Sequence, residues 1–248
     1  MDNTLTRTDI AGRPIVERRA VSFSAIDKFT NCPRKFHAYD VAKIIKEPEN
    51  PQMKDGWRVH KAMSDFIAHD TPLPPDMERY ADWVTTMLTG QPDEIIHTEH
   101  RLACTFDLQP CDYFSRKVKP WLRAQADLLV VNGSHALSVD WKTGKEKDER
   151  YELLPKNFQL RLTALLIFLH FPQVKTISSK YVYLNDGNAT SFEMPKEDLR
   201  LFVPQAYDIL GGIQKALRAN SFPPRPSGLC KKHCGVTACE YHGKGAYG

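Results

Sequence analysis

The chain has 248 residues, of which 42% are hydrophobic and 26% are charged, and its formal net charge is +4 at pH 7. This composition is typical of a folded globular protein, and the length suits one large domain or a core with insertions. The sequence has no run of 18 apolar residues and no apolar segment near its start, which argues against a membrane span and a signal peptide. We therefore expect a cytoplasmic protein without a membrane partner, in which the six cysteines are thiols or metal ligands rather than disulfides.

The first third of the chain is expected to be helical. Residues 1–20 carry no periodic pattern and should form a flexible arm, and residues 21–92 should form a helical part. Its first helix should begin within 21–27, with Ser24 as the N-cap. A loop with two prolines is expected at 47–55, and helices are expected at 34–45, 56–69 and 77–88.

The remainder of the chain alternates between strand and helix patterns. Within a core of 93–222, we expect strands at 95–106, 124–131, 136–141 and 177–184, and helices at 158–171 and 196–219. This order predicts an α/β fold with a central mixed sheet flanked by helices. The unit 21–222 would be followed by a tail, 223–248, that is rich in Pro, Gly and Cys and has no periodicity.

Two carboxylates stand in the expected hairpin at 124–141. If Val131 pairs with Ala136, paired residue numbers sum to 267, which places Asp127 opposite Asp140 on one face. Lys142 points to the same face because it lies two residues beyond Asp140. Opposed carboxylates repel unless a cation compensates them, and oxygen ligands suit Mg²⁺ or Mn²⁺. The alternative is that Asp140 is a solvated strand-end residue and that Asp127 pairs with Lys142.

Several motifs in this order resemble a known family. They are SFSAIDKFTNCPRKF at 22–36, the G-x-x-x-H of Gly56 and His60, Ala126-Asp127, DWKTG at 140–144, Gln159, and the cysteine tail at 224–243. Together they are similar to the RecB-like branch of the PD-(D/E)XK nucleases, near Cas4 and the exonucleases of bacteriophages. The resemblance spans about 23–242 and implies a restriction-endonuclease-like core.

The resemblance also implies roles for single residues. Asp127, Asp140, the Trp141 backbone carbonyl and His60 would hold Mg²⁺ or Mn²⁺. Lys142 would position the attacking water, and Gln159 would contact DNA or support Lys142, so that the catalytic set is Asp127, Asp140, Lys142 and Gln159. Thr163 replaces the Tyr of the family's Q-x-x-x-Y motif. For His60 the alternative is a partly buried helix histidine with one hydrogen bond. Glu99 shares one face of the preceding strand with His97 and Arg101, and it could either join the site or form a salt bridge to a basic neighbour.

The cysteines of the tail form a second candidate site. Cys230, Cys234 and Cys239 follow one another within ten residues, and the resemblance implies that they join Cys32 around a [4Fe-4S] cluster. Such a cluster would clamp the tail to the N-terminal helix. The C-x3-C-x4-C spacing differs from the C-x2-C-x5-C associated with Cas4, so zinc bound with His233 or His242 stays open, as do unliganded thiols. Cys104 and Cys111 are expected to be ordinary thiols.

The function that follows is a metal-dependent DNA exonuclease that processes ends in replication, recombination or repair. The alternatives are a Cas4-like nuclease that trims CRISPR spacers and a catalytically silent module that binds DNA ends. The expected partners are linear or single-stranded DNA ends and a single-strand annealing or replication protein, in the cytoplasm of a bacterial host if the gene is carried by a phage. Trp57 and Tyr151 could stack on a frayed end, with core packing as the default for Trp57. Candidate phosphate contacts, each of which is equally an ordinary surface charge, are Arg34, Lys35, Lys145, Lys147, Lys231 and Lys232.

Overall fold

The computed structural model describes residues 20–47, 50–88, 93–144, 153–155 and 157–244. The chain divides into two compact units, one made of Met1–Pro48 and Val203–Gly248 and the other of Glu49–Phe202. The first unit therefore joins the two ends of the chain, whereas the sequence suggested consecutive segments of 21–222 and 223–248. No helix among the described residues has the length and apolar character that a membrane crossing requires.

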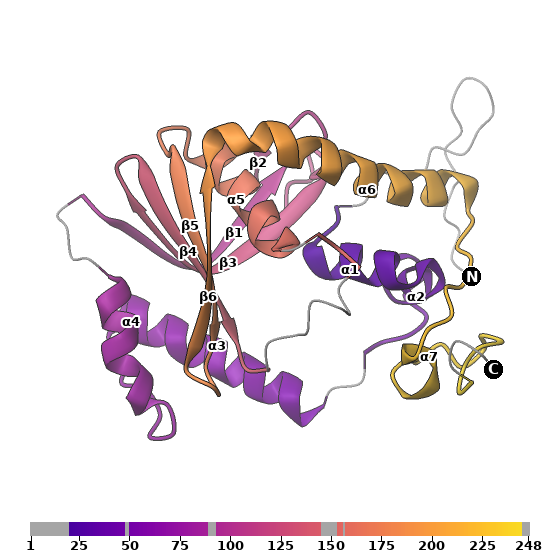
Figure 1. Cartoon of the computed structure of the whole chain (residues 1–248), viewed down its shortest axis with the longest axis horizontal. Coiled ribbons are helices and arrows are strands. Elements are labelled where there is room, and N and C mark those ends of the chain that lie inside the picture. The colour runs from indigo at the N-terminus through magenta and orange to yellow at the C-terminus, as the bar shows by residue number, and fades with distance from the viewer. Residues whose placement is uncertain (1–19, 48–49, 89–92, 145–152, 156, 245–248) are drawn as a thin grey trace. The chain divides into compact units, whose positions relative to one another are not determined.

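A six-stranded sheet forms the centre of the unit Glu49–Phe202, in the order β2-β1-β3-β4-β5-β6 (Figure 1). The strands β4 and β5 are parallel, and every other neighbouring pair is antiparallel. A parallel pair needs a crossover, and α5 (Phe158–His170) supplies it. The predicted mixed α/β sheet is confirmed, and its strands are β1 (Ile95–Cys104), β2 (Pro110–Cys111), β3 (Leu122–Asn132), β4 (His135–Lys142), β5 (Thr176–Tyr183) and β6 (Asn188–Pro195).

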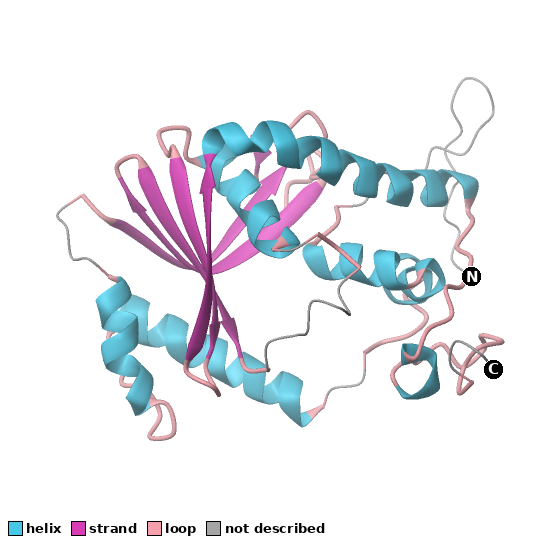
Figure 2. Cartoon of the chain, in the orientation of Figure 1, coloured by secondary structure: helices cyan, strands magenta, loops and turns pink. Residues whose placement is uncertain are grey.

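Helices cover both faces of this sheet (Figure 2). One face packs against α3 (Pro51–His69), the 3-10 turn Glu78–Tyr80 and α4 (Ala81–Met87). Side chains of the hairpin that were predicted to pack do so here, among them Leu128, Val139 and Trp141, each 2% exposed or less. On the other face, α5 has buried residues around its whole circumference, as expected for a helix enclosed by protein.

Two helix starts and two strands differ from the sequence prediction. The helix α3 begins at Pro51 rather than at 56, because the Asn50 side chain accepts a hydrogen bond from the Met53 N–H at 2.8 Å and Pro51 occupies the first helical position. The first helix, α1 (Phe23–Asn31), has Ser22 rather than Ser24 at its N-cap. The strands β2 and β6 were not predicted; β6 is an edge strand whose largely exposed residues carry little apolar signal.

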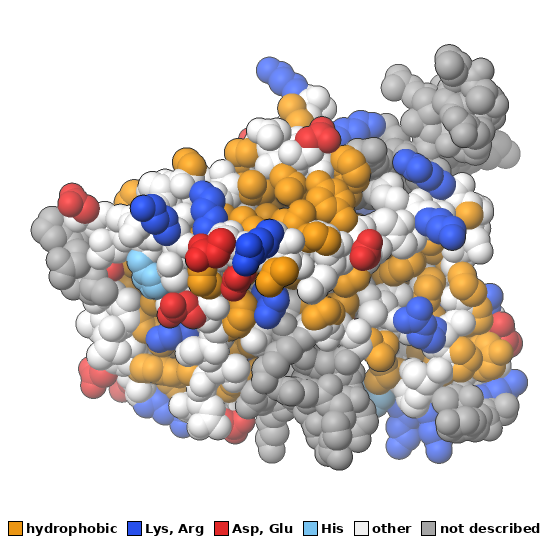
Figure 3. All heavy atoms as spheres, turned by 45° about the horizontal axis from the view of Figure 1, so that its top comes forward, with side chains coloured by type: hydrophobic (Ala, Val, Ile, Leu, Met, Phe, Trp, Pro, Cys, Tyr) orange, Lys and Arg blue, Asp and Glu red, His pale blue; other side chains and the backbone are white. Residues whose placement is uncertain are grey.

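The unit that joins the chain ends is mainly helical. It contains α1, α2 (Pro33–Phe36), a π-helical turn His37–Val41 that ends the expected 34–45 helix, and α7 (Leu229–Lys232). The helix α6 (Leu199–Ala219) runs through Gly211-Gly212 without a break, and Phe29 lies beside Gly212. On the molecular face in Figure 3, basic side chains are interspersed with acidic and hydrophobic ones, which agrees with the small net charge.

Candidate active site

The β3–β4 hairpin has the register predicted from the sequence. Its pairs run from Asn132↔His135 to Leu128↔Val139, so paired residue numbers sum to 267 and Asp127 follows opposite Asp140. The β3–β4 pairing ends at this point, and the Trp141 N–H donates instead to Asp127 Oδ2 at 2.8 Å. Asp127 is buried, with 8% of its surface exposed. The end of the hairpin therefore directs a buried carboxylate and a half-buried one toward the same region.

Two further ligand groups meet Asp127. His60 comes from α3 and places Nδ1 3.3 Å from Asp127 Oδ1, and Glu99 comes from β1 and places Oε1 3.9 Å from His60 Nδ1. Among the His, Cys, Asp and Glu side chains that the structure describes, one group of three has its ligand atoms within 4.8 Å of one another. This group is His60, Glu99 and Asp127. The grouping agrees with a set of metal ligands, and the roles of His60 and Glu99 stay predictions, because His60 in α3 is half-buried against Asp127 and Glu99 lies beside His60.

The position of Glu99 depends on an unusual backbone conformation. In the β1–β3 register Glu99 stands opposite Asp127, between the pairs Thr98↔Leu128 and His100↔Ala126. Its φ is 50°, in the left-handed region that non-glycine residues seldom adopt. One carboxylate oxygen accepts a hydrogen bond from Gln125 Nε2, and the other is buried with no hydrogen-bond partner among the described residues. A buried carboxylate oxygen without a donor fits a site for a cation.

Lys142 pairs with Asp140 and not with Asp127, so the alternative of an Asp127–Lys142 pair is wrong. The Lys142 Nζ lies 2.6 Å from Asp140 Oδ2 and donates to Gln159 Oε1 at 3.2 Å. Gln159, at the start of α5, donates from Nε2 to Asp140 Oδ1 at 2.7 Å. Gln159 thus contacts both partners of the ion pair, which agrees with a supporting position for this side chain.

Tyr181 completes this network and was not singled out from the sequence. Its hydroxyl donates to Gln159 Oε1 at 3.4 Å, and Lys142 Nζ lies 4.9 Å from the centre of its ring. The parallel β4–β5 pairing sets Tyr181 beside Asp140. Thr163 stands where the Q-x-x-x-Y motif has its Tyr. It is buried, and its hydroxyl donates a hydrogen bond to the Gln159 backbone carbonyl at 3.1 Å.

The electrostatics of the site reflect an excess of carboxylates. Burial, against the opposing charge of Lys142 and with the added repulsion of Asp127, raises the pKa of Asp140 to about 6. Burial and the charge of Asp127 also raise the pKa of Glu99. Burial alone would lower the pKa of His60, but its hydrogen bond to Asp127 and the neighbouring carboxylates outweigh burial and raise it. Each shift favours a form that is less negative or more positive, which is the response expected where several carboxylates lie close together.

These residues line one cleft of about 1070 Å³. Its wall also includes Trp57, Arg101 and Gln125, together with Trp141, whose carbonyl was predicted to bind metal. Trp57 is 82% exposed, so the default expectation that it packs in the core is wrong. The other site residues and their chain neighbours that line the cleft are His60, Glu99, Asp127, Asp140, Lys142, Thr143, Gly144 and Gln159.

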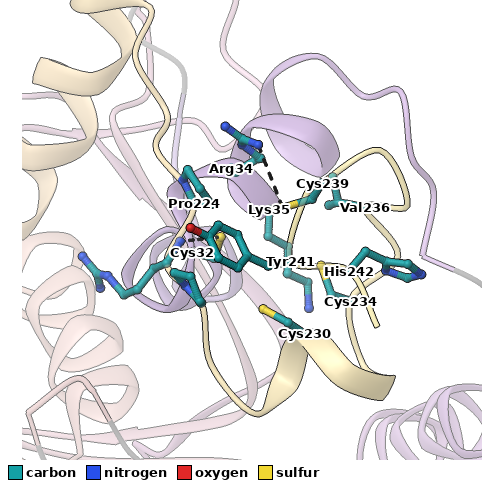
Figure 4. A pocket seen from close by; sticks show the side chains of 12 residues that line it. Cys32, Arg34, Lys35, Pro224, Cys230, Cys234, Val236, Cys239, Tyr241 and His242 are labelled. Atoms are coloured by element: carbon teal, nitrogen blue, oxygen red, sulfur yellow. Dashed lines mark hydrogen bonds between the residues drawn. The ribbon is translucent and has the colours of Figure 1, made fainter. Parts of the chain in front are cut away.

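The four predicted cysteine ligands line a different cavity (Figure 4). Three of their sulfurs accept hydrogen bonds: the Arg225 N–H donates to Cys32 at 3.4 Å, the Ser227 N–H to Cys230 at 3.4 Å, and Arg34 Nη1 to Cys239 at 3.9 Å. Of the two histidines considered as zinc ligands, His242 lines this cavity. Cys104 and Cys111 lie in β1 and β2, and neither is part of the cavity wall.

The candidate phosphate contacts that are described all belong to the unit that holds the cysteines. Arg34 Nη1 is 2.5 Å from Glu240 Oε2, and Lys35 Nζ is 5.7 Å from the centre of the Tyr39 ring. Lys231 and Lys232 are exposed in α7. Lys145, Lys147 and Tyr151 lie outside the described residues. Arg34 is thus already engaged by an acidic side chain, while Lys231 and Lys232 remain accessible.

Comparison with known proteins assigns the chain to a family. A family model described as the PD-(D/E)XK nuclease superfamily matches residues 20–241. The chain therefore belongs to the PD-(D/E)XK nuclease superfamily, whose members are nucleases, and the family suggested by the sequence motifs is confirmed at this level. The closer similarity to Cas4 or to bacteriophage exonucleases stays a prediction.

Two solved structures resemble the chain at low sequence identity. The crystal structure of SSO0001 has a TM-score of 0.45 and 13% identity, covering 91% of this chain and 88% of that one. A structure described as "Putative exonuclease" from Eubacterium rectale has a TM-score of 0.47 and 8% identity, covering 86% of each chain. No sequence among the curated proteins matches the chain.

Proposed function

We propose that this protein is a metal-dependent deoxyribonuclease that hydrolyses phosphodiester bonds at DNA ends. The observation that carries the proposal is the convergence of His60, Glu99 and Asp127, whose ligand atoms lie within 4.8 Å of one another. The Asp140–Lys142 pair lines the same cleft. The preference for ends rests on the motif resemblance to exonucleases.

The donor set fits a divalent cation of the Mg²⁺ or Mn²⁺ type. Carboxylate oxygens suit both ions, and an imidazole nitrogen is accepted more readily by Mn²⁺ than by Mg²⁺. His60, Glu99, Asp127 and Asp140 would hold the ion, with the Trp141 carbonyl as a further candidate, and the unpartnered Glu99 Oε1 is the atom that most needs it. A bound ion of this kind lowers the pKa of a water ligand and neutralises charge on the scissile phosphate.

The protein's own contribution is the position of a fixed positive charge. Lys142 Nζ is held between Asp140 Oδ2 and Gln159 Oε1, with the Tyr181 ring beneath it. A charge that is oriented before the reaction stabilises negative charge on the phosphate without reorganisation at the moment of cleavage. Gln159 is a positioning residue in this scheme, because it contacts Asp140 and Lys142.

The cysteine cavity supports the proposal of an iron–sulfur cluster. Tetrahedral zinc has Zn–S bonds of about 2.3 Å, which sets its sulfurs about 3.8 Å apart. The four cysteines Cys32, Cys230, Cys234 and Cys239 line one cavity, which supports a shared metal centre, and metal analysis decides between a cluster and zinc. In a [4Fe-4S] cluster each thiolate binds a separate iron and the sulfurs stand farther apart. The hydrogen bonds donated to Cys32, Cys230 and Cys239 suit thiolate ligands in either case.

The test is digestion of end-labelled linear DNA and covalently closed circular DNA in Mg²⁺, Mn²⁺ or EDTA. We expect linear DNA to be degraded in either metal, circular DNA to survive, and EDTA to stop the reaction. Asp140→Asn should lower the rate at least about 100-fold, whereas Asp186→Asn, in the exposed β5–β6 turn, should not. Cleavage of circular DNA would refute the preference for ends, and cleavage in EDTA would refute the metal dependence. An RNA substrate of the same sequence tests the restriction to DNA.

A further inference from the structure

We propose that Trp57 stacks on an unpaired nucleotide at the active-site cleft, so that the preferred substrate is a single-stranded DNA end, a proposal that rests on the nuclease function above. Trp57 is 82% exposed and lines the same cleft as Asp127 and Lys142. It precedes His60 by three residues in α3, a spacing that places both side chains on neighbouring positions of one helix surface. The candidate metal ligand and the exposed indole are therefore carried by the same rigid element.

The exposure of this side chain is costly without a partner. A tryptophan carries one of the largest apolar surfaces of any side chain, and leaving it in water forfeits several kcal/mol of burial at about 25 cal/mol per Å². All four tryptophans lie in the described part of the chain. Trp121 and Trp141 are 2% exposed and Trp83 is partly buried, so Trp57 differs in burial from the other three tryptophans.

The helix turn that carries Trp57 is held in place. Arg58 donates to both carboxylate oxygens of Asp76, at 3.2 and 2.7 Å, and to Asp55 at 2.8 Å. The Asn50 side chain caps the start of the same helix. Trp57 thus stands on a fixed backbone, which lowers the entropy lost when a ligand stacks on it.

The surroundings favour a nucleobase over a protein partner. A protein interface would need a contiguous apolar patch, but most residues that line the cleft with Trp57 are polar or charged. They include Asn50, Gln52, Lys61, Arg101 and Gln125, together with the carboxylates Asp65, Glu99, Asp127 and Asp140. A π-face among hydrogen-bonding and cationic groups is the arrangement that binds single-stranded nucleic acid. Bases inside a duplex are covered by their neighbours and must leave the stack before another ring can cover them, so we expect the indole to stack on an unpaired base.

A second aromatic surface adjoins the cleft through Arg101. This residue lines both the cleft and a cavity of about 500 Å³ that also contains Tyr113 and Phe114. Phe114 is 61% exposed, and the Arg101 guanidinium lies 5.0 Å from the centre of its ring. A strand that crosses the cleft would find a cation and a further stacking face beyond the carboxylates. Arg101 and Phe114 are therefore the candidates for the next nucleotide along the strand.

Tryptophan fluorescence tests the stacking directly, because Trp57 is the one highly exposed tryptophan of the four. The wild-type protein is titrated with a single-stranded oligonucleotide in Ca²⁺, and a gel checks that the oligonucleotide stays intact. We expect emission to fall on binding, Trp57→Phe to abolish the change while retaining affinity within about threefold, and Trp57→Leu to weaken binding about 10-fold. Trp83→Phe should leave the change in place.

Cleavage assays separate this proposal from the proposed nuclease function. Trp57→Leu should slow digestion of single-stranded ends about 10-fold and change blunt duplex ends less than twofold, whereas Leu201→Ala, an exposed control outside the cleft wall, should affect neither. Active wild-type protein with unchanged single-strand binding and cleavage in Trp57→Leu would overturn the stacking proposal alone. An inactive wild type whose fluorescence still falls on binding would uphold stacking and overturn the nuclease function. Equal losses on both substrates would mean that Trp57 supports the site rather than an unpaired base.

Discussion

Replacing Asp140 with Asn should stabilise the metal-free protein at pH 8 while it abolishes cleavage. Burial of Asp140, together with the charge of Asp127, disfavours its ionised form more than Lys142 favours it, and the pKa rises from 3.8 to about 6. At pH 8 the folded protein therefore holds a carboxylate charge that the unfolded chain would carry at less cost. The amide of Asn carries no charge and can still accept the hydrogen bond from Gln159 Nε2.

The magnitude follows from the shift. About two pKa units at 1.36 kcal/mol per unit give an upper limit of about 3 kcal/mol. The pKa of Asp140 is higher in the folded than in the unfolded protein, so the folded state favours the protonated carboxyl. The stability that depends on this proton is fully present below pH 3.8, is lost as pH rises through 6, and stays lost above it. The variant also loses the ion pair with Lys142, so we expect a net gain of about 1–3 kcal/mol at pH 8. For a chain of this size that is a rise in Tm of roughly 2–12 °C.

The assay is thermal unfolding in EDTA at pH 8 and at pH 4, with wild type, Asp140→Asn and the turn variant Asp186→Asn. The gain should be large at pH 8, small at pH 4, and absent for Asp186→Asn. Mn²⁺ at 100 times its Kd should stabilise the wild type by about 2.7 kcal/mol and so raise its Tm. It should raise the Tm of Asp140→Asn much less. An Asp140→Asn protein no more stable than wild type at pH 8 in EDTA would refute the view that Asp140 is held ionised at a net cost.

Three further predictions follow from the site and the cysteine cavity. His60→Ala should reduce cleavage less than Asp140→Asn does and should recover partly in Mn²⁺, because imidazole suits that ion; equal rates to wild type in both metals would leave His60 structural. Tyr181→Phe removes one hydrogen bond to Gln159 and should lower kcat about 2–10-fold with little change in KM, while a change in KM alone would contradict a positioning role. Anaerobically purified protein should contain iron and absorb broadly near ~400 nm, and Cys32→Ala but not Cys111→Ala should lose both iron and thermal stability; stoichiometric zinc without iron would replace the cluster.

The hairpin was predictable because local rules determine it. The Gly133-Ser134 turn and the alternation on both sides leave one register in which the apolar residues share a face, and that register places Asp127 and Asp140 together. The same alternation assigned Leu128, Val139 and Trp141 to the packed face, where the structure has them. Sequence alone thus located the two carboxylates of the hairpin and the lysine beside them.

The partners of these residues could not be predicted in the same way. Glu99 reaches Asp127 through β1–β3 pairing between segments far apart in sequence, and through a positive φ that no glycine signals. Tyr181 reaches Gln159 through a parallel pairing across the α5 crossover. Composition rules predicted a buried Trp57, because large apolar side chains usually lie in the core, and they do not identify an exception such as this exposed one. Tertiary pairing thus determined the positions of Glu99 and Tyr181, which local patterns do not reveal.

The three carboxylates of the site differ in their contacts. Asp140 contacts Lys142 and Gln159, Asp127 accepts the Trp141 N–H with one oxygen, and Glu99 has an oxygen with no hydrogen-bond partner among the described residues. One lysine opposes these three carboxylates, whose charges outweigh burial and raise the pKa of His60. A ring nitrogen that binds a metal ion must give up its proton, so a metal bound by His60 should bind more tightly as pH rises. The acidic residues that repel one another in this cleft are therefore the ones that would bind the cation.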